Sequence, residues 1–417
     1  MGDVRGVGRR LFLKGGAVAM ASFGLGPRFL LRAASAAPPR DGAVLVAIFQ
    51  RGAVDGLSMV VPHGESRYYE RRRTIAVPRP GGADGALDLD GFFGLHPAMA
   101  SLAPAFDAGE LAIVHACGSP DPSRSHFDAQ DYMETGLPGD RTATDGWLNR
   151  HLQSTPRQDA SSVRAVAVAP QMPRALAGPA PALATTSLGE VAFGPPAQAA
   201  SARAAVERMY AGRDDVLGAA TRDALASLDV FARLDAEPYQ PANGAVYPSS
   251  ELGTQLRDVA QVIKAKVGLE IAYLNVGSWD THSLQGGASG QLASLLRDLA
   301  SSLAAFRADL GTELERVCVL TMSEFGRTLD ENGSGGTDHG HATAMLLLGG
   351  RVAGGRVHGD WPGLAAGQLF EGRDLAVTTD FRTLFAEILV EHLRNPDVAA
   401  VFPGFSYDAR SRLGVIA

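Results

Sequence analysis

The feature that most constrains the fold of this chain is a regular alternation of short apolar runs with longer amphipathic segments. Apolar runs of this length are typical of strands covered on both faces, and the longer segments have the spacing of helices. Alternating strands and helices predict an α/β fold, a three-layer sandwich with a mostly parallel central sheet. The expected strands are 44–49, 111–116, 163–168, 271–276, 317–320 and 344–348, and the expected helices are 96–107, 125–135, 197–235, 249–267, 291–309 and 381–393.

Polar residues gather directly after several of the expected strands. In mostly parallel sheets, ligands bind beyond the carboxyl ends of the strands, so these positions are the first candidates for a functional site. The segments concerned are 50–56, 123–128, 279–282, 323–328 and 337–341.

Two of these segments have the spacing of metal ligands. Asp280 and His282 alternate along an extended chain, and Asp338, His339 and His341 follow in a second cluster. Alternate residues of an extended chain share one side, so carboxylate and imidazole can converge on one divalent cation, with Zn²⁺ or Mn²⁺ as the best candidates. The same residues also fit a structural role, in which Asp280 forms a turn and Asp338 bonds its own backbone.

The segment around Ser125 has two interpretations. Ser125 and Asp128 have the spacing of a helix capping box, which needs no further function. Alternatively, Ser125 is a nucleophile at a helix N-terminus, where backbone N–H groups hold an anionic ester. His126 is then a metal ligand or a general acid, and Arg327 clamps the anion or pairs with a surface carboxylate.

The first residues resemble an export signal. Arg9-Arg10 precedes Leu11-Phe12-Leu13-Lys14, an apolar stretch follows, and Ala34-Ser35-Ala36 is a cleavage pattern. This order predicts a twin-arginine signal over 1–36 and a periplasmic or secreted protein, with no stable membrane span after signal removal. The mature part is then one α/β domain, 37–417, in which the Ala- and Pro-rich segment 169–250 is a helical insertion or cap.

Composition excludes several classes of function. Residues 1–36 contain six Lys or Arg and one Asp, so their removal changes the formal charge from −7 to −12. Nucleic-acid binding is therefore not expected, because phosphate neutralisation needs basic side chains. Only Lys264 and Lys266 follow residue 36, which argues against Schiff-base chemistry. Cys117 and Cys318 end apolar runs and are expected to be inert core thiols, with one disulfide as the alternative.

Long motifs in these segments resemble one family. The sequence is similar to the exported "domain of unknown function 1501" family over about 41–405, in the motifs FQRGAVDGL at 49–57, SHFDAQDYMETG at 125–136, DGWLNR at 145–150, WDTH at 279–282, SEFGRT at 323–328 and GTDHGH at 336–341. The resemblance implies an alkaline-phosphatase-like fold, in the superfamily of alkaline phosphatases and sulfatases. It also implies metal ligation by Asp55, Asp280, His282, Glu324, Asp338, His339 and His341, with Ser125 as the nucleophile.

One departure from the superfamily pattern keeps a second function open. Phe325 follows Glu324 where the superfamily has a His ligand, and Phe cannot bind metal. The first expectation is an exported, metal-dependent hydrolase of phosphate, sulfate or related esters, whose partner is a small anionic ester. The alternative is a non-catalytic binding or assembly protein for another exported protein, and a third idea is glycan recognition by Trp147, Trp279 and Trp361.

Overall fold

The computed structural model describes residues 42–157, 163–186, 196–234 and 238–417. The expected export signal, 1–36, lies outside these described residues. So do 158–162 and, in the expected helical insertion, 187–195 and 235–237.

A central sheet organises the described part of the chain. Its nine strands follow the order β13-β5-β12-β9-β1-β8-β6-β7, with β14 paired to β5. Strand β12 is antiparallel to both of its neighbours, and every other pairing in this sheet is parallel, which confirms the mostly parallel sheet. The strands are β1 (Val44–Gln50), β5 (Leu111–Gly118), β6 (Ala165–Val168), β7 (Leu183–Thr185), β8 (Ile271–Val276), β9 (Val317–Met322), β12 (Thr343–Gly349), β13 (Arg356–His358) and β14 (Thr379–Asp380).

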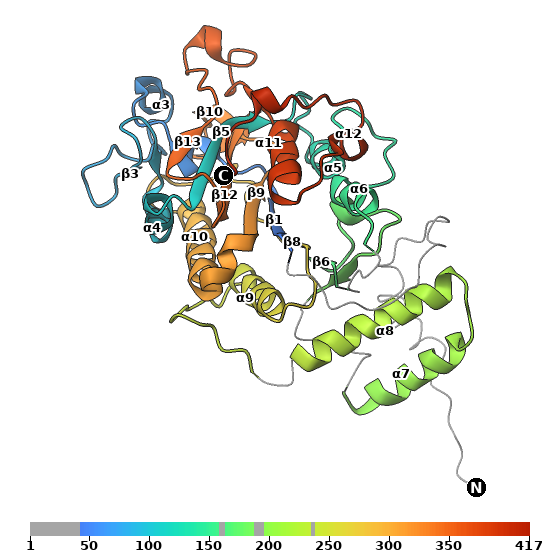
Figure 1. Ribbon diagram of the computed structural model, residues 1–417. Helices are drawn as coiled ribbons and strands as arrows, with labels where there is room; N and C mark the ends of the chain where they lie inside the picture. Colours follow the sequence, from blue (N-terminus) through green and yellow to red (C-terminus); the bar gives the residue numbers. More distant parts are fainter. Residues whose placement is uncertain (1–41, 158–162, 187–195, 235–237) are drawn as a thin grey trace.

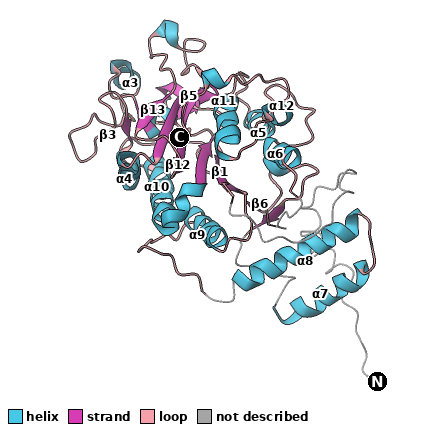
Figure 2. Ribbon diagram, viewed as in Figure 1, coloured by secondary structure: helices cyan, strands magenta, loops and turns pink. Residues whose placement is uncertain are grey.

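Helices cover both faces of the sheet, as the pattern of layers in Figures 1 and 2 shows. Side chains of β1 alternate between the faces: Val46 and Ile48 pack on one side, Ala47 and Phe49 on the other. The first face is covered by η1 (Pro97–Leu102), α4 (Ala103–Asp107), α9 (Glu251–Lys264) and α10 (Gln291–Leu310). The second is covered by α5 (His126–Thr135), α6 (Trp147–Ser154), α11 (Phe381–Glu387) and α12 (Val398–Val401).

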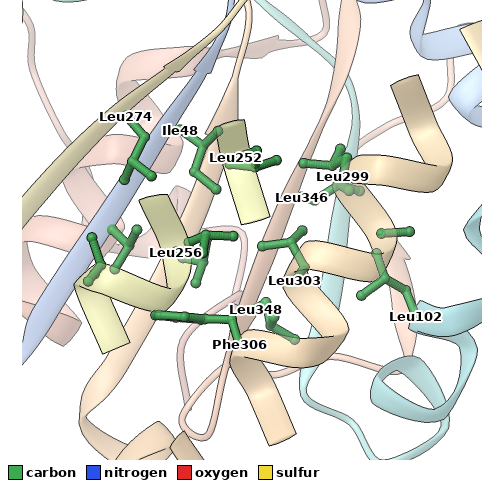
Figure 3. Packing of buried hydrophobic residues seen from close by; sticks show 14 of the residues in the cluster. Ile48, Leu102, Leu252, Leu256, Leu274, Leu299, Leu303, Phe306, Leu346 and Leu348 are labelled. Atoms are coloured by element: carbon green, nitrogen blue, oxygen red, sulfur yellow. The ribbon is translucent and has the colours of Figure 1, made fainter. Parts of the chain in front are cut away.

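The core beneath α10 shows why this layer forms. Leu299, Leu303 and Phe306 lie on one side of α10 and pack against Ile48 and Leu346 of the sheet (Figure 3). All five side chains are buried. Truncating one such leucine to alanine costs about 2–5 kcal/mol, because the lost transfer free energy and the cavity add.

Shorter elements connect these layers. They form a three-stranded sheet in the order β2-β4-β3 and a β10-β11 hairpin. They are α2 (Gly56–Met59), β2 (Val60–Val61), α3 (Ser66–Arg71), β3 (Leu87–Asp88), β4 (Gly94–Leu95), η2 (Arg174–Leu176), η3 (Gly311–Arg316), β10 (Arg327–Glu331), β11 (Thr337–His339), η4 (Ala366–Gln368) and η6 (Ala409–Ser411).

Three expected helices differ from the structure. The segment 96–107 is a 3₁₀ helix followed by one short α-helix, with Met99 in a non-helical conformation. The segment 197–235 is two helices, α7 (Pro196–Tyr210) and α8 (Val216–Leu234), and residue 235 lies outside the described residues. The last helix ends in a π-type turn, η5 (Ile388–His392). Prolines at 97 and 104 explain the first break, because proline removes a helical N–H.

Helices α7 and α8 stand beside the β6 side of the sheet in Figure 1. The C-terminal half of α8 is tied to the body: Phe231 is buried in the core, and the Gln261 side chain donates to the Leu234 carbonyl at 2.6 Å. No helix among the described residues has both the length and the apolar character that crossing a membrane requires.

The cysteines and two of the tryptophans lie in the core. Cys117 and Cys318 are both free and buried, which confirms the expected core thiols, and burial raises the pKa of Cys318 to about 12. Trp147 and Trp279 are fully buried, so they cannot form a glycan-binding surface. Trp361 is only partly buried and packs against Phe93.

Candidate metal centre

The polar segments singled out in the sequence meet at one edge of the sheet. Strands β1, β5, β8 and β9 run in the same direction, so the residues that follow them emerge at the same edge. His126 begins α5 after β5, Asp280 and His282 follow β8, and Glu324 follows β9. The β10-β11 hairpin then returns to this edge and carries His339.

Four side chains converge there and form what we call the donor cluster: His126, Asp280, His282 and His339. The Nε2 atom of His339 lies 2.9 Å from Nε2 of His126 and 2.9 Å from Nε2 of His282. Asp280 Oδ1 lies 3.0 Å from His282 Nε2 and 3.3 Å from His339 Nε2, and its Oδ2 lies 3.5 Å from His126 Nε2. Ligand atoms of His126, Asp280 and His339 all lie within 4.8 Å of one another.

The other ring nitrogen of each histidine is tied to an acceptor. Nδ1 of His126 lies 2.8 Å from Glu324 Oε1, and Nδ1 of His282 lies 3.0 Å from Asp338 Oδ1. Nδ1 of His339 lies 2.9 Å from the backbone oxygen of Arg124. Because each of these oxygens can only accept, Nδ1 carries the proton. In a neutral ring this leaves the Nε2 lone pair directed at the cluster, the arrangement usual for metal-binding histidines.

Glu324 holds His126 from a buried position. Besides His126, its Oε1 accepts from the Gly52 backbone N–H at 2.8 Å and from Gln130 Nε2 at 2.8 Å, and its Oε2 accepts from Ser323 Oγ at 3.1 Å. Gly52 has a φ of +113°, and a Cβ there would lie 2.7 Å from the Asp280 backbone nitrogen. Only glycine therefore allows this close approach.

Arg327 orients Asp280 from the buried side of the donor cluster. Its guanidinium is fully buried and donates to Asp280 Oδ1, and also to the backbone oxygens of Gly52 at 2.7 Å, Ala53 at 2.8 Å and Thr337 at 3.0 Å. Burial raises the pKa of Asp280, but the hydrogen bond and charge of Arg327 outweigh it and keep that pKa below its ordinary value. Asp280 is thus an ionised carboxylate.

The pKa values of the neighbouring rings His126 and His339 are shifted in opposite directions. The hydrogen bond to Glu324 and its charge raise the pKa of His126. Burial, together with the charge of His126, lowers the pKa of His339. This difference follows from position, because His126 faces a buried carboxylate, whereas His339 faces a backbone oxygen and two other rings.

The donor cluster is open to solvent on one side. The side chain of Asp280 is 46% exposed and that of His126 is 24% exposed. Two large apolar side chains stand out beside it: Phe127, next to His126, is 89% exposed, and Leu284, two residues after His282, is 80% exposed.

Three expected site residues lie elsewhere or play another part. Asp55 is fully buried in an ion pair with Arg72, whose Nη1 and Nη2 donate to its two oxygens at 2.6 and 3.0 Å. His341 is buried and stacks on Phe370 with ring centroids 4.3 Å apart. Ser125 is the exposed N-cap of α5, and its Oγ accepts only a long hydrogen bond, 3.5 Å, from the Asp128 N–H.

Glu324 and Asp338 were expected as ligands. Their carboxylates instead contact the Nδ1 atoms of His126 and His282, the ring nitrogens that face away from the donor cluster. Two contributors to the site were not predicted from the sequence, Gln130 and the backbone oxygen of Arg124. Gln130 lies four residues after His126, on the same face of α5, and that helical spacing is a usable signal. The Arg124 backbone oxygen has none.

The donor set suits a divalent ion. Three imidazole nitrogens and one carboxylate are ligands that Zn²⁺ and Mn²⁺ accept, and tetrahedral Zn²⁺ takes four such atoms. The guanidinium of Arg327 lies between Asp280 and the end of β1, where it donates to Asp280 and to the Gly52 oxygen.

Comparison with known protein families gives a match over most of the chain. The sequence model of the family described as "Protein of unknown function (DUF1501)" matches residues 43–397. No curated protein matches the chain.

Proposed function

We propose that this chain, which belongs to the DUF1501 family of proteins of unknown function, is an exported metal-dependent hydrolase of phosphate, sulfate or related esters. One observation carries the proposal. Nε2 of His339 meets three partners at once, His126, His282 and Asp280, at 2.9, 2.9 and 3.3 Å.

A single ring nitrogen cannot hydrogen-bond three partners in this way. It holds either one proton or one lone pair, so at most one of these contacts is a good hydrogen bond. A divalent cation bound by the four side chains satisfies all of the contacts together. Ligand atoms around tetrahedral Zn²⁺ lie about 3.3 Å apart, given bonds of about 2.0–2.1 Å. The contacts between donor atoms given above run from 2.9 to 3.5 Å.

The neighbouring residues supply the rest of the chemistry. A bound divalent ion polarises an ester oxygen and lowers the pKa of a coordinated hydroxyl or water. Ser125, exposed beside His126, is the proposed nucleophile: its Oγ loses a proton and bonds to phosphorus or sulfur, while the bond to the leaving oxygen breaks and that oxygen takes up a proton. Water then cleaves the seryl ester. Arg327 is a positioning residue in this scheme, because its buried guanidinium contacts Asp280 and not the solvent side.

The fold supports the same class of enzyme. The donor cluster lies beyond the carboxyl ends of a mostly parallel sheet with helices on both faces, where α/β enzymes bind ligands. The motifs that resemble the DUF1501 family include all four residues of the donor cluster, and that resemblance implies the superfamily of alkaline phosphatases and sulfatases. We therefore assign the chain to that superfamily as part of this proposal.

Hydrolysis is tested with the Zn²⁺- or Mn²⁺-loaded protein on aryl phosphate monoesters, phosphate diesters and sulfate esters. We expect turnover of at least one of these classes, lost in Ser125→Ala while metal content stays unchanged. A metal-loaded protein that hydrolyses none of the three contradicts the enzyme proposal. Equal turnover of Ser125→Ala and wild type removes Ser125 from the nucleophile role.

The exposed apolar pair favours a second candidate function. Phe127 follows His126 and Leu284 lies two residues after His282, and both side chains are exposed, at 89% and 80%. A non-catalytic protein that docks another exported protein around its metal explains this exposure as well. Phe127→Ser separates the candidates: partner capture is lost in an assembly protein, whereas turnover of a small ester persists in an enzyme.

Export remains a separate part of the proposal. It is supported by the order of Arg9-Arg10, an apolar stretch and Ala34-Ser35-Ala36 in the sequence. Changing both arginines to lysine should leave the full-length precursor in the cytoplasm of a host with a twin-arginine system. Unchanged export of that variant would contradict this route.

A further inference from the structure

We propose that Gln285 is a positioning residue that fixes the spacing of two of the three segments bearing the donor cluster, those that carry Asp280, His282 and His339. This inference rests on the metal site proposed above. One segment, 279–285, carries Asp280 and His282, and the other, β11, carries Asp338 and His339. We call the group formed by Gln285 with Thr281, Thr337 and Asp55 the Gln285 brace.

The side chain of Gln285 connects both segments directly. Its Oε1 accepts from Thr281 Oγ1 at 2.8 Å and from Thr337 Oγ1 at 2.8 Å. Thr281 lies between Asp280 and His282 in the chain, and Thr337 directly precedes Asp338. Each hydroxyl is thus at most two residues from a ligand or its supporting carboxylate. A backbone hydrogen bond of 3.2 Å from Thr337 N–H to the Thr281 oxygen runs parallel to this link.

Asp55 fixes which way the amide of Gln285 faces. Gln285 Nε2 donates to Asp55 Oδ2 at 2.7 Å. A flipped amide would place its oxygen against the carboxylate, and its N–H₂ group against hydroxyls that now donate to Oε1. Since a carboxylate only accepts, only one orientation pairs these atoms. Asp55 is itself held by Arg72, which also donates to the Thr328 and Leu329 backbone oxygens at 2.8 and 2.9 Å.

The brace is shielded from water. Gln285, Asp55, Arg72 and Thr337 are fully buried, and Thr281 is 1% exposed. Buried hydrogen bonds in such a network are expensive to leave unmade, so the spacing that satisfies Gln285 is strongly favoured. The donor cluster, by contrast, is partly exposed, with Asp280 46% and His282 42% exposed.

The backbone around Gln285 is shaped to turn its side chain inward. Leu284 has a φ of +51°, which is costly for a residue with a Cβ. Leu284 and Gln285 donate their N–H groups to the Ser334 and Gly335 oxygens at 3.0 and 2.9 Å, which fixes this turn against the β10-β11 hairpin. The strained turn sends Leu284 out to solvent and Gln285 to the brace, and strain of this kind gathers at functional sites.

The expected consequence of losing the brace is weaker metal binding. Metal ligands must be held to within about 0.5 Å of their productive positions. Outer partners that orient ligands typically change metal affinity by about 10–100-fold when they are removed. Gln285 does not contact a ligand itself, but it holds two ligand-bearing segments at once. We therefore expect its loss to lower metal affinity by the same factor, about 10–100-fold, with an unchanged number of bound ions.

The test compares two buried glutamines at this edge of the sheet. Gln285→Met keeps side-chain volume and removes the hydrogen bonds. Gln50→Met is the matched control, because Gln50 is also fully buried but neither polar atom of its amide has a hydrogen-bond partner in the described part of the chain. Zn²⁺ affinity is measured by chelator competition on full mature protein, and the visible spectrum of the Co²⁺ form reports ligand geometry.

We expect Gln285→Met to bind Zn²⁺ about 10–100-fold more weakly than wild type, with a changed Co²⁺ spectrum, while Gln50→Met matches wild type in both. Wild-type affinity and spectrum in a folded Gln285→Met variant overturn the brace, as does an equal loss in Gln50→Met. If Gln285→Met does not fold, Thr337→Val decides by the same two readouts, because it removes a single hydroxyl.

The wild-type titration separates this inference from the proposed function. Failure of wild type to bind Zn²⁺, Mn²⁺ or Co²⁺ overturns the metal site, and the brace with it. Binding by wild type, with no difference between wild type and either brace variant, overturns the brace alone.

Discussion

The donor cluster and the Asp55–Arg72 ion pair lie at the same edge of the sheet, yet they are built in opposite ways. In the ion pair, one carboxylate is fully buried and saturated by one guanidinium and the Gln285 amide. In the donor cluster, the half-exposed carboxylate of Asp280 lies close to three Nε2 atoms. In neutral rings these atoms carry lone pairs and no protons, so they cannot donate hydrogen bonds to one another. A buried arginine contacts each of the two carboxylates, Arg72 at Asp55 and Arg327 at Asp280. The carboxylate is structural where it is fully buried, and it becomes a candidate ligand where it stays half-exposed and imidazoles meet it.

The largest expected effect comes from breaking the buried ion pair. Arg72→Met leaves the Asp55 carboxylate without its counter-charge and should lower the free energy of unfolding by about 3–5 kcal/mol. Denaturant unfolding at neutral pH measures this loss. The control is Arg71→Met, because Arg71 pairs with Asp330 at the surface, and exposed ion pairs contribute about 1 kcal/mol or less. Equal losses in the two variants would contradict the distinction.

A second buried carboxylate sharpens the comparison through pH. Glu270 accepts from His151 at 2.8 Å and from Arg164 at 2.6 Å; although burial raises its pKa, these partners lower it from 4.5 to about 2. A depressed carboxylate pKa stabilises the fold above pH 4.5, and this contribution disappears as the pH falls toward 2.

The corresponding experiment compares wild type with Glu270→Gln. At pH 7 the variant should be less stable by about 3 kcal/mol, from roughly 2.5 pH units at 1.36 kcal/mol each. The gap should shrink between pH 4.5 and pH 2. Urea unfolding at pH 7, 5, 4 and 3 follows it, and a gap that is constant across this range would show that ionisation of Glu270 is not its source.

Substituting the buried carboxylate that orients His126 should affect binding more than stability. Glu324→Gln removes the negative charge at His126 Nδ1, and Zn²⁺ affinity is expected to fall about 10–100-fold. Chelator competition gives the ratio directly. Unaltered affinity would mean that the hydrogen bond from His126 to Glu324 does not set the ring's tautomer.

The smallest effect is expected at the exposed counterpart of Glu324. Asp338 holds His282 Nδ1 at 3.0 Å but is 57% exposed, and Asn332 shares the same oxygen. Water and Asn332 can replace part of this contact, so Asp338→Asn should weaken Zn²⁺ binding by less than tenfold. A loss as large as that of Glu324→Gln would show that burial does not govern the strength of these outer contacts.

The sequence predicts the architecture well because the signals involved are local. Apolar runs such as 44–49 and 317–320 are strands of the central sheet, and the strong apolar periodicity of 291–309 is α10. Short elements escaped prediction, since β13 and β14 have three and two residues and too few positions for a period. Their pairing with β5 depends on contacts remote in the sequence.

The candidate site is only partly predictable, because partners decide what a polar residue does. Asp280, His282 and His339 meet as their spacing suggests, together with His126. Asp55 follows a strand just as Asp280 does, but it forms a fully buried ion pair with Arg72, seventeen residues later. His341 is two residues from His339 and yet stacks on Phe370. No spacing rule contains these partners, which the fold alone brings together.

The most direct test of the account is the metal content of three proteins: wild type, His339→Ala and His341→Ala, each exported, purified and then equilibrated with Zn²⁺. His339 lies at the centre of the donor cluster, and His341, on the same segment, lies outside it. The account predicts about one equivalent in wild type and His341→Ala and almost none in His339→Ala. Metal-free wild type, or equal metal content in all three proteins, would contradict it.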